Sequence, residues 1–372
     1  MELQNKRELL ERRRLLASYP EQLQILPASP VFRNDEKGFF TYSPYLDTVT
    51  NFTQTNTAKL VFKAQTCVRY LNNEQKLNLD CPLSLNCQVQ YAFQQYEQCN
   101  QTANMRRVIR GLMQTYGLKS EQIFVEAPRF LKNYLQELQE FRIKFVDADF
   151  TADLHNGAKN VYVKFYYYYF EMPCVFCNFA LVNLNEDLGT SQLDSIVFQE
   201  RLNMIKDQVP YPFARPEYQV CRLFLQEIIQ QSRLNQLQIH RLLNDVLAIV
   251  SLAANEVPLT AKGAGSEFRR KVKHLCLYFE FYCGGLPPVV DLLTLIEKMA
   301  VIQGLSLGSL TKLAGYLSTC EQQIQKFRAQ YGETEVSTAT AAKLHQSKGV
   351  PLEVFGYRQP VRNDIYYFKA QD

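Results

Sequence analysis

The sequence has no run of about 18 apolar residues, the length that crosses a bilayer as a helix, so we expect no membrane span. The first sixteen residues, MELQNKRELLERRRLL, have the pattern of a charged amphipathic helix and lack the apolar core of a signal peptide. The formal net charge is +4, too small by itself to predict binding to nucleic acid. Ten cysteines in a chain without a secretion signal indicate reduced thiols and a cytoplasmic location.

Histidines at metal-ligand spacing are also missing. His155, His240 and His274 are isolated, so neither a zinc site nor a catalytic triad can be assembled from them. Cys174 and Cys177 form one CxxC pair, but no second pair follows and the segment around them is apolar. We therefore predict two buried structural thiols and no metal site.

The 372 residues are enough for two domains with hydrophobic cores. Up to about residue 205, strand and helix patterns alternate. The expected strands are Ala58–Val68, Gln122–Glu126, Val161–Glu171 and Cys174–Leu184, and the expected helices are Ala103–Tyr116, closed by Gly117, and Phe130–Phe141. The last two strands are long and joined by a tight connection, which predicts antiparallel pairing.

After about residue 206 the pattern is helical almost throughout. The expected helices are Tyr218–Ser232, Asn235–Asn255, Glu267–Tyr282, Val290–Ile302 and Ser309–Tyr331. Patterning weakens after that, although Asp364–Lys369 could add a strand. We expect an α+β domain over residues 1–205, a helical domain over 206–331 and a tail over 332–372.

Two segments resemble known sequence motifs of a catalytic site. Gln65–Arg69 reads QTCVR, and Leu193–Leu202 reads LDSIVFQERL. In this order, with tyrosine-rich strands between them, they resemble motifs 2 and 3 of the class II aminoacyl-tRNA synthetases. Further ordered matches at Tyr91–Gln94, Asn178–Asn185 and Asn244–Arg270 make the chain similar to the catalytic half of alanyl-tRNA synthetase across roughly residues 10–330. The resemblance implies a class II synthetase-like antiparallel sheet flanked by helices, followed by an all-helical domain.

The resemblance also implies roles for single residues in a site for ATP, Mg²⁺ and a small amino acid. Arg69 would hold the α-phosphate and Arg201 the γ-phosphate, because arginine offers a rigid donor fork and a permanent charge. Phe93 would stack on adenine. Asp194 would pair with the ammonium group of the amino acid, and Asn178 would orient it. Magnesium would bridge the phosphates.

A tRNA acceptor stem is the partner that the resemblance implies for the helical domain. Its contact residues would be Arg269, Arg270 and Lys273, since clustered cations suit phosphate contacts. The alternative for the run Arg269–His274 is a solvated helix face.

Several positions depart from the family pattern. Ile196 and Phe198 stand where motif 3 has glycines, Tyr70–Glu74 lacks the glycines of the motif 2 loop, and Gln94 replaces a carboxylate. A rival alignment matches the segment Pro173–Cys177 to a "PCGPC" segment of the family and gives up the Asn178 match. Two functions therefore stay open, besides a purely structural module. One is an enzyme that activates an amino acid with ATP, and the other is an inactive paralogue that binds tRNA, an amino acid or a protein.

Simpler explanations exist for the same residues. Ser191–Asp194 fits the S-x-x-D pattern of a helix start, in which Asp194 would only favour the helix N-terminus. Arg69 could be a surface residue at a strand end, and Phe93 a core residue. The sequence names neither the amino acid nor the oligomeric state.

Overall fold

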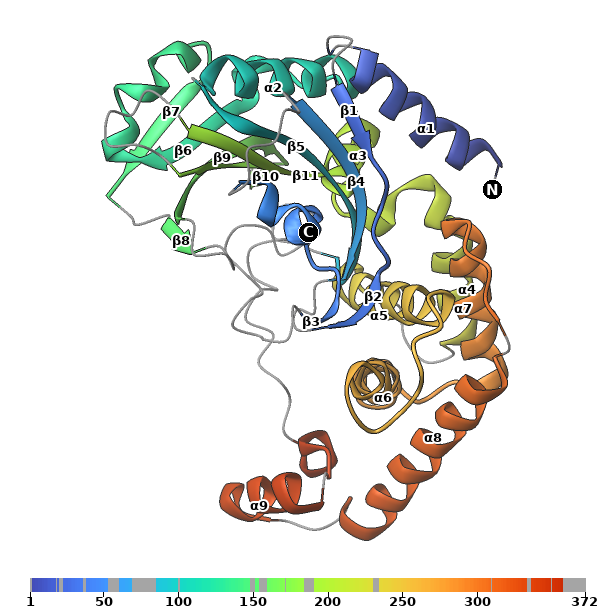
Figure 1. Cartoon of the computed structure of the whole chain (residues 1–372). Helices are drawn as coiled ribbons and strands as arrows, with labels where there is room; N and C mark the ends of the chain where they lie inside the picture. The colour runs from blue at the N-terminus through green and yellow to red at the C-terminus, as the bar shows by residue number, and fades with distance from the viewer. Residues whose placement is uncertain are drawn as a thin grey trace. The chain divides into compact units, whose positions relative to one another are not determined.

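The chain is described here from a computed structural model (Figure 1). The structure describes residues 2–17, 19, 23–35, 38–52, 60–68, 85–99, 101–147, 151–153, 159–170, 172–183, 191–229, 234–308, 310–332, 336–348 and 350–356. The chain divides into two compact units, Met1–Pro216 and Glu217–Asp372.

The first unit is built on one sheet, to which the described residues contribute nine strands. Eight run in the order β1-β4-β5-β11-β10-β9-β6-β7, and β8 pairs with β9. The pairs β1–β4 and β6–β7 are parallel and the others antiparallel. The strands are β1 Leu23–Leu26, β4 Leu60–Val68, β5 Cys87–Cys99, β6 Ile123–Pro128, β7 Arg142–Val146, β8 Thr151–Asp153, β9 Lys159–Tyr169, β10 Met172–Val182 and β11 Ser191–Phe198, beside a separate hairpin of β2 Phe32–Asp35 and β3 Gly38–Phe40.

Helices cover one face of this sheet. They are α1 Glu2–Ala17, α2 Thr102–Tyr116 and α3 Gln199–Asp207 (Figure 1). Aromatic side chains fill the space beneath them: the Arg12 guanidinium of α1 lies 5.3 Å from the ring centre of Phe62, and Tyr19 stacks on Phe93 at 4.8 Å. We call this side the helix face.

The opposite side of the same strands is polar. Successive side chains of a strand point to opposite faces, so β4 and β5, which bury Phe62 and Phe93 on the helix face, turn Lys63 and Gln94 to the other side. Gln65, Gln90 and Asp194 lie on that side too, and all five are buried. We call this side the polar face. The short helices η1 Pro44–Asp47 and η2 Val49–Phe52 contribute to its cover, through Thr48 to Gln94 and through Asp47 to Lys63.

Most of the expected elements of the first unit are confirmed. Helix α2 ends at Gly117, which adopts the left-handed conformation with φ 70° that glycine tolerates. Strands β9 and β10 pair antiparallel along most of their length, with a register shift between Val175 and Cys177. The α+β architecture with a mainly antiparallel sheet flanked by helices is thus as predicted.

The predicted α-helix over Phe130–Phe141 is wrong. The segment forms two 3₁₀ helices, η5 Arg129–Leu131 and η6 Tyr134–Leu138. Leu131, Leu135 and Leu138 are buried at helical spacing, which is the pattern that suggested an α-helix. Short turns with i→i+3 hydrogen bonds bury the same positions, so the apolar period alone does not fix the helix type.

The second unit is helical. Its described helices are α4 Gln219–Ile228, α5 Gln236–Ala254, α6 Ala264–Tyr282, α7 Val289–Gln303, α8 Thr311–Tyr331, α9 Thr338–Lys348 and the short η9 Leu352–Phe355. The five helices expected from the sequence are confirmed, with α5 packing on α6 and α7. Asn235 and Gln238 start α5 with a reciprocal capping box. Helix α9 lies in the segment expected to be a weakly patterned tail, and Asp364–Lys369 lies outside the described residues. Across the described part of the chain, no helix combines the length and apolarity that a bilayer crossing needs.

Gly265 permits a close approach near the start of α6. A Cβ built there would lie 2.3 Å from the Pro258 carbonyl oxygen and 2.5 Å from the Thr260 backbone nitrogen. Gly315, inside α8, has nothing within 4 Å of its added Cβ. We expect Gly265→Ala to lower the free energy of unfolding by about 1–3 kcal/mol through overpacking. Gly315→Ala should raise it by up to about 1 kcal/mol through helix propensity. Urea unfolding of both variants checks this, and equal effects would contradict it.

Candidate functional site

Asp194 lies in the middle of a strand. Ser191–Phe198 forms β11, where Asp194 pairs with Ala180 of β10, and helix α3 begins only at Gln199. The alternative in which Asp194 merely starts a helix is therefore wrong. A buried carboxyl in a central strand needs another explanation, because charged groups are rarely buried without a partner.

Among the described residues, an amide and no cation holds the Asp194 carboxyl. It is 6% exposed, and Gln94 Nε2 donates to its Oδ1 at 2.8 Å. Burial raises the pKa of Asp194 to about 7, against the opposing effect of hydrogen bonds from Gln94 and the Ser195 backbone. Near neutral pH the side chain is thus divided between its acid and its carboxylate form.

Gln94 is itself fixed in orientation. Its Nε2 also donates to Thr48 Oγ1 at 2.9 Å, and its Oε1 accepts from the Tyr96 hydroxyl at 2.9 Å. These bonds turn the amide nitrogen toward Asp194. The replacement of a carboxylate by Gln94 therefore gives Asp194 a neutral donor where a second acid would repel it.

Two further polar side chains lie on the strands that flank β11. Asn178 of β10 pairs with Ile196, and Gln90 of β5 pairs with Phe198. Within the described structure, Asn178 Oδ1 and both polar atoms of Gln90 are buried and have no hydrogen-bond partner. Such groups cost free energy when they stay unpaired. We call Gln90, Asn178, Asp194, Ile196 and Phe198 the polar strip. Asn178 and Ile196 are its half-buried members, and the other three are buried.

Arg201 and Phe198 close one end of the polar strip. Arg201 is 5% exposed, donates from Nη1 to the Val175 carbonyl at 2.7 Å, and lies 4.0 Å from the centre of the Phe198 ring. The ring occupies the position at which motif 3, which this segment resembles, has a glycine. The guanidinium is thus engaged by a carbonyl and an aromatic ring, as in a structural stack.

Phe93 lies on the other side of the sheet. Gln94 reaches Asp194 on the polar face, so its neighbour Phe93 points to the helix face, where Tyr19 stacks on it. A base could reach the Phe93 ring only if Tyr19 moved. The structure therefore brings Asp194, Asn178 and Arg201 along one strip and does not bring Phe93 to it. Arg69 and Tyr70–Glu74 lie outside the described residues, so the role of Arg69 stays a prediction.

The basic run of α6 does not form one face. Lys271 turns inward to Asp245 at 3.5 Å, and His274 contacts the same carboxyl. Arg270 pairs with Glu267 one turn earlier.

Arg269 lies 4.7 Å from the centre of the Tyr316 ring of α8. Lys273 follows Arg269 by four residues on the same side of the helix. Of the three predicted tRNA contacts, Arg269 and Lys273 therefore share a side, and Arg270 faces elsewhere.

Cys174 and Cys177 are buried free thiols, as predicted. Burial raises the pKa of the Cys177 thiol well above its usual value, and the Asp194 charge adds to the effect. A protonated thiol is a poor metal ligand, which fits a structural role for this pair. Within the described residues, no group of three or more His, Cys, Asp or Glu side chains is placed to hold a metal ion.

The sequence interpretation missed Gln90 and saw in Gln94 only a departure from the family pattern. A signal was present: Gln88, Gln90 and Gln94 recur at even spacing in a segment of strand-forming residues. Period-two polarity in a strand indicates a polar face, and here it marks the face that contains Asp194.

Comparison with known proteins gives a loose likeness. No protein-family model and no curated protein matches the sequence. Similar solved structures include PylSc, a pyrrolysyl-tRNA synthetase of Desulfitobacterium hafniense, with 11% identity and a TM-score of 0.33. Another is the apo histidyl-tRNA synthetase of S. aureus, with 10% identity and a TM-score of 0.35. Each match covers 55% of this chain and 70% of the other. Both are class II synthetases, and neither likeness bears on activity or on alanine.

The raised pKa of Asp194 predicts how the free energy of unfolding depends on pH. Between about pH 4 and pH 7 the folded protein keeps a proton that the unfolded chain has lost, so the free energy of unfolding falls as the pH rises. Asp194→Asn keeps an acceptor for Gln94 and removes the titration. Its free energy of unfolding should lack this fall and exceed that of the wild type at pH 8 by up to roughly 4 kcal/mol.

Urea unfolding at pH 5, 6, 7 and 8 measures the difference. Asp147→Asn is the control, because Asp147 is an exposed acid paired with Arg129. That variant should keep the wild-type fall between pH 5 and pH 7. The same fall in Asp194→Asn would show that another group causes it.

Proposed function

We propose that the protein is a class II synthetase-like binding protein whose polar strip holds the ammonium group of a small amino acid and that does not activate it with ATP. The observation on which this depends is Asp194: a buried acid with a raised pKa, beside the hydrogen-bond acceptor Asn178 Oδ1, which has no partner in the described structure. Burial disfavours the charged form of this acid, and its described hydrogen bonds offset that effect only in part. Perturbed acids of this kind gather at functional sites.

A ligand ammonium group supplies what the strip lacks. It places a positive charge against Asp194 and offers donors to Asn178 Oδ1. The added charge favours the carboxylate form, so the pKa of Asp194 falls on binding and a proton leaves. Gln94, fixed by Thr48 and Tyr96, keeps its donor on Asp194 Oδ1 when the ligand binds.

Two described residues support leaving ATP out of the proposal. The Arg201 guanidinium is engaged by the Val175 carbonyl and by Phe198, which fills a position that the family keeps open for the nucleotide. Phe93, the expected adenine platform, is covered by Tyr19. The proposal therefore keeps amino-acid binding from the family and leaves out the ATP-dependent step and its magnesium.

Calorimetric titration with glycine, alanine and serine at pH 8 tests binding. We expect one of them to bind the wild type, and Asp194→Asn to weaken that binding by roughly ten- to a hundred-fold, the loss of one charge-assisted hydrogen bond. Because Asp194 must ionise, wild-type affinity should rise between pH 6 and pH 8, and proton release should accompany binding at pH 6.5. Asp147→Asn again serves as the control with unchanged affinity.

The opposite results are equally clear. If none of the three amino acids binds, amino-acid binding by the strip is wrong. Amino-acid-dependent pyrophosphate exchange with ATP should stay at background. Exchange above background that Arg69→Ala and Arg201→Ala remove would restore the activating enzyme in place of the binding protein.

We further propose that α6 of the second unit contacts tRNA phosphates through Arg269 and Lys273. The supporting observation is their shared side of the helix, with Arg269 supported by the ring of Tyr316. Arg270, paired with Glu267, contributes less than the sequence suggests. Two cations at this spacing suit neighbouring phosphates of a stem.

Binding of a tRNA pool at 50–200 mM salt tests this contact. The double variant Arg269→Ala, Lys273→Ala should bind more weakly and lower the slope of log affinity against log salt by about two, one for each lost phosphate contact. Lys343→Ala, which removes an exposed cation from α9, should leave the slope unchanged. Equal slopes for wild type and double variant would overturn the proposal.

A further inference from the structure

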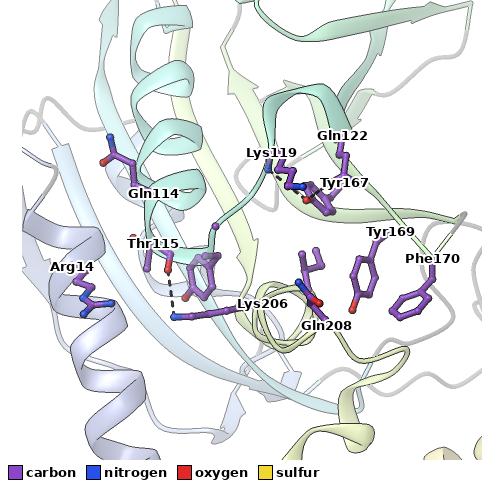
Figure 2. A pocket seen from close by; sticks show the side chains of 13 residues that line it. Arg14, Gln114, Thr115, Lys119, Gln122, Tyr167, Tyr169, Phe170, Lys206 and Gln208 are labelled. Atoms are coloured by element: carbon purple, nitrogen blue, oxygen red, sulfur yellow. Dashed lines mark hydrogen bonds between the residues drawn. The ribbon is translucent and has the colours of Figure 1, made fainter.

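A second candidate site lies on the helix-face side of the first unit, away from the polar strip. A pocket of about 640 Å³ opens between the C-terminal end of α2, the C-terminal end of α3 and the turn that joins β9 to β10 (Figure 2). Tyr167 of β9 lines it and is buried toward the helices, whereas Tyr168, the next residue, is 50% exposed. Strand alternation thus separates this pocket from Asp194 by the thickness of the sheet. Its volume is in the range of small-molecule sites.

The charged residues of the pocket have one sign. Arg14, Lys119 and Lys206 line it, and none of the described lining residues is acidic. Lys206 is partly neutralised, since its Nζ lies 2.6 Å from Glu11 and 3.4 Å from the Thr115 carbonyl. Arg14 and Lys119 are exposed at the rim. A ligand with an anionic group matches a cation of this kind.

Aromatic rings form the other wall. Figure 2 shows Tyr169 and Phe170 across the pocket from Arg14 and Lys206, with Gln208 between them. The rings of Tyr169 and Phe170 meet edge to face, 4.5 Å apart, and Phe170 is 46% exposed. Tyr169 is anchored because its hydroxyl donates to the carbonyl oxygen of Val209 at 3.1 Å. An exposed ring beside an anchored one offers a stacking surface for a planar group.

Two lining residues hold strained backbone. Phe170 has φ 44° and Gln208 has φ 54°, the left-handed region that side chains with a Cβ rarely adopt. They are two of the four described non-glycine residues with positive φ. Glycine or asparagine would relieve the strain at the β9–β10 turn, so the turn alone does not call for phenylalanine there. Strain that persists at a pocket indicates that the side chains are used.

We propose that this pocket binds a nucleoside monophosphate. The phosphate lies against Lys119, and the base stacks on Phe170 beside Tyr169. Gln122 and Gln208 offer amide groups to the edge of the base. Since the proposal uses no residue of the polar strip, it stands or falls independently of the function proposed above.

Fluorescence anisotropy with mant-labelled AMP on the full chain tests the site, with unlabelled AMP, GMP, UMP, adenosine, ribose 5-phosphate and inorganic phosphate as competitors. The absence of tryptophan from the chain keeps the background low. We expect the monophosphates to compete at least about ten-fold better than adenosine or ribose 5-phosphate, because the base and the phosphate each contribute. Equal competition by inorganic phosphate, or no binding of any nucleotide, would overturn the proposal.

Two variants separate binding from folding. Phe170→Asn suits the left-handed turn, so its melting temperature should equal or exceed that of the wild type while mant-AMP affinity falls about ten-fold. Lys119→Gln should weaken binding as well, whereas Lys132→Gln, an exposed lysine outside the pocket, should not. Asp194→Asn should leave mant-AMP binding unchanged. Unchanged affinity in the folded Phe170→Asn and Lys119→Gln variants would contradict the assignment.

Discussion

The two-residue alternation of the central strands is the constraint on which the rest of the first unit depends. In β5, Phe93 enters the helix face while Gln94 reaches Asp194 on the polar face. A slip by one residue would bury Gln94 under the helices and expose an aromatic ring to the polar strip. Burial of the aromatic side chains under the helices therefore sets the strand register, and the register determines which polar residues meet on the polar face. The aromatic stack of Tyr19 on Phe93 and the hydrogen bond from Gln94 to Asp194 are two consequences of one register.

The helices and strands that could be predicted from the sequence are those with a clear local periodicity. Helix α2, strands β9 and β10 and the helices of the second unit follow patterns that lie within the segment itself. The partners of Asp194 are of another kind. Gln94 is 100 residues away from it and Thr48 is 46 residues from Gln94, so their meeting depends on strand order and register. The family resemblance gave the order of the motif-like segments along the chain. It did not say on which face of the sheet each side chain would lie, and for this reason Phe93 was expected beside Asp194.

The segment that resembles motif 3 shows how an aromatic ring at one position engages a neighbouring arginine. Phe198 stands in a strand that leads directly into α3, and its ring stacks against the Arg201 guanidinium. Once the ring is there, the arginine has a neighbour on one side and the Val175 carbonyl on another. The ring thus packs against the arginine to which the resemblance assigns a phosphate. The two charged residues of the segment therefore differ. Arg201 packs against a ring and a carbonyl. Asp194 is a buried acid whose pKa is raised to about 7.

Asp194 is the residue whose presence stability alone does not explain. Asparagine would accept the same hydrogen bond from Gln94 and would not lose free energy on burial above neutral pH. Stability alone does not explain Phe170 on the other side of the sheet either, since asparagine would suit its positive φ better. In both places the side chain present is less favourable to the fold than an available substitute. Residues of that kind are where sequence and fold disagree locally, and such disagreements concentrate at functional sites. The sheet therefore separates two candidate binding surfaces, one centred on a buried acid that needs a cation and one on cations and rings that need an aromatic anion.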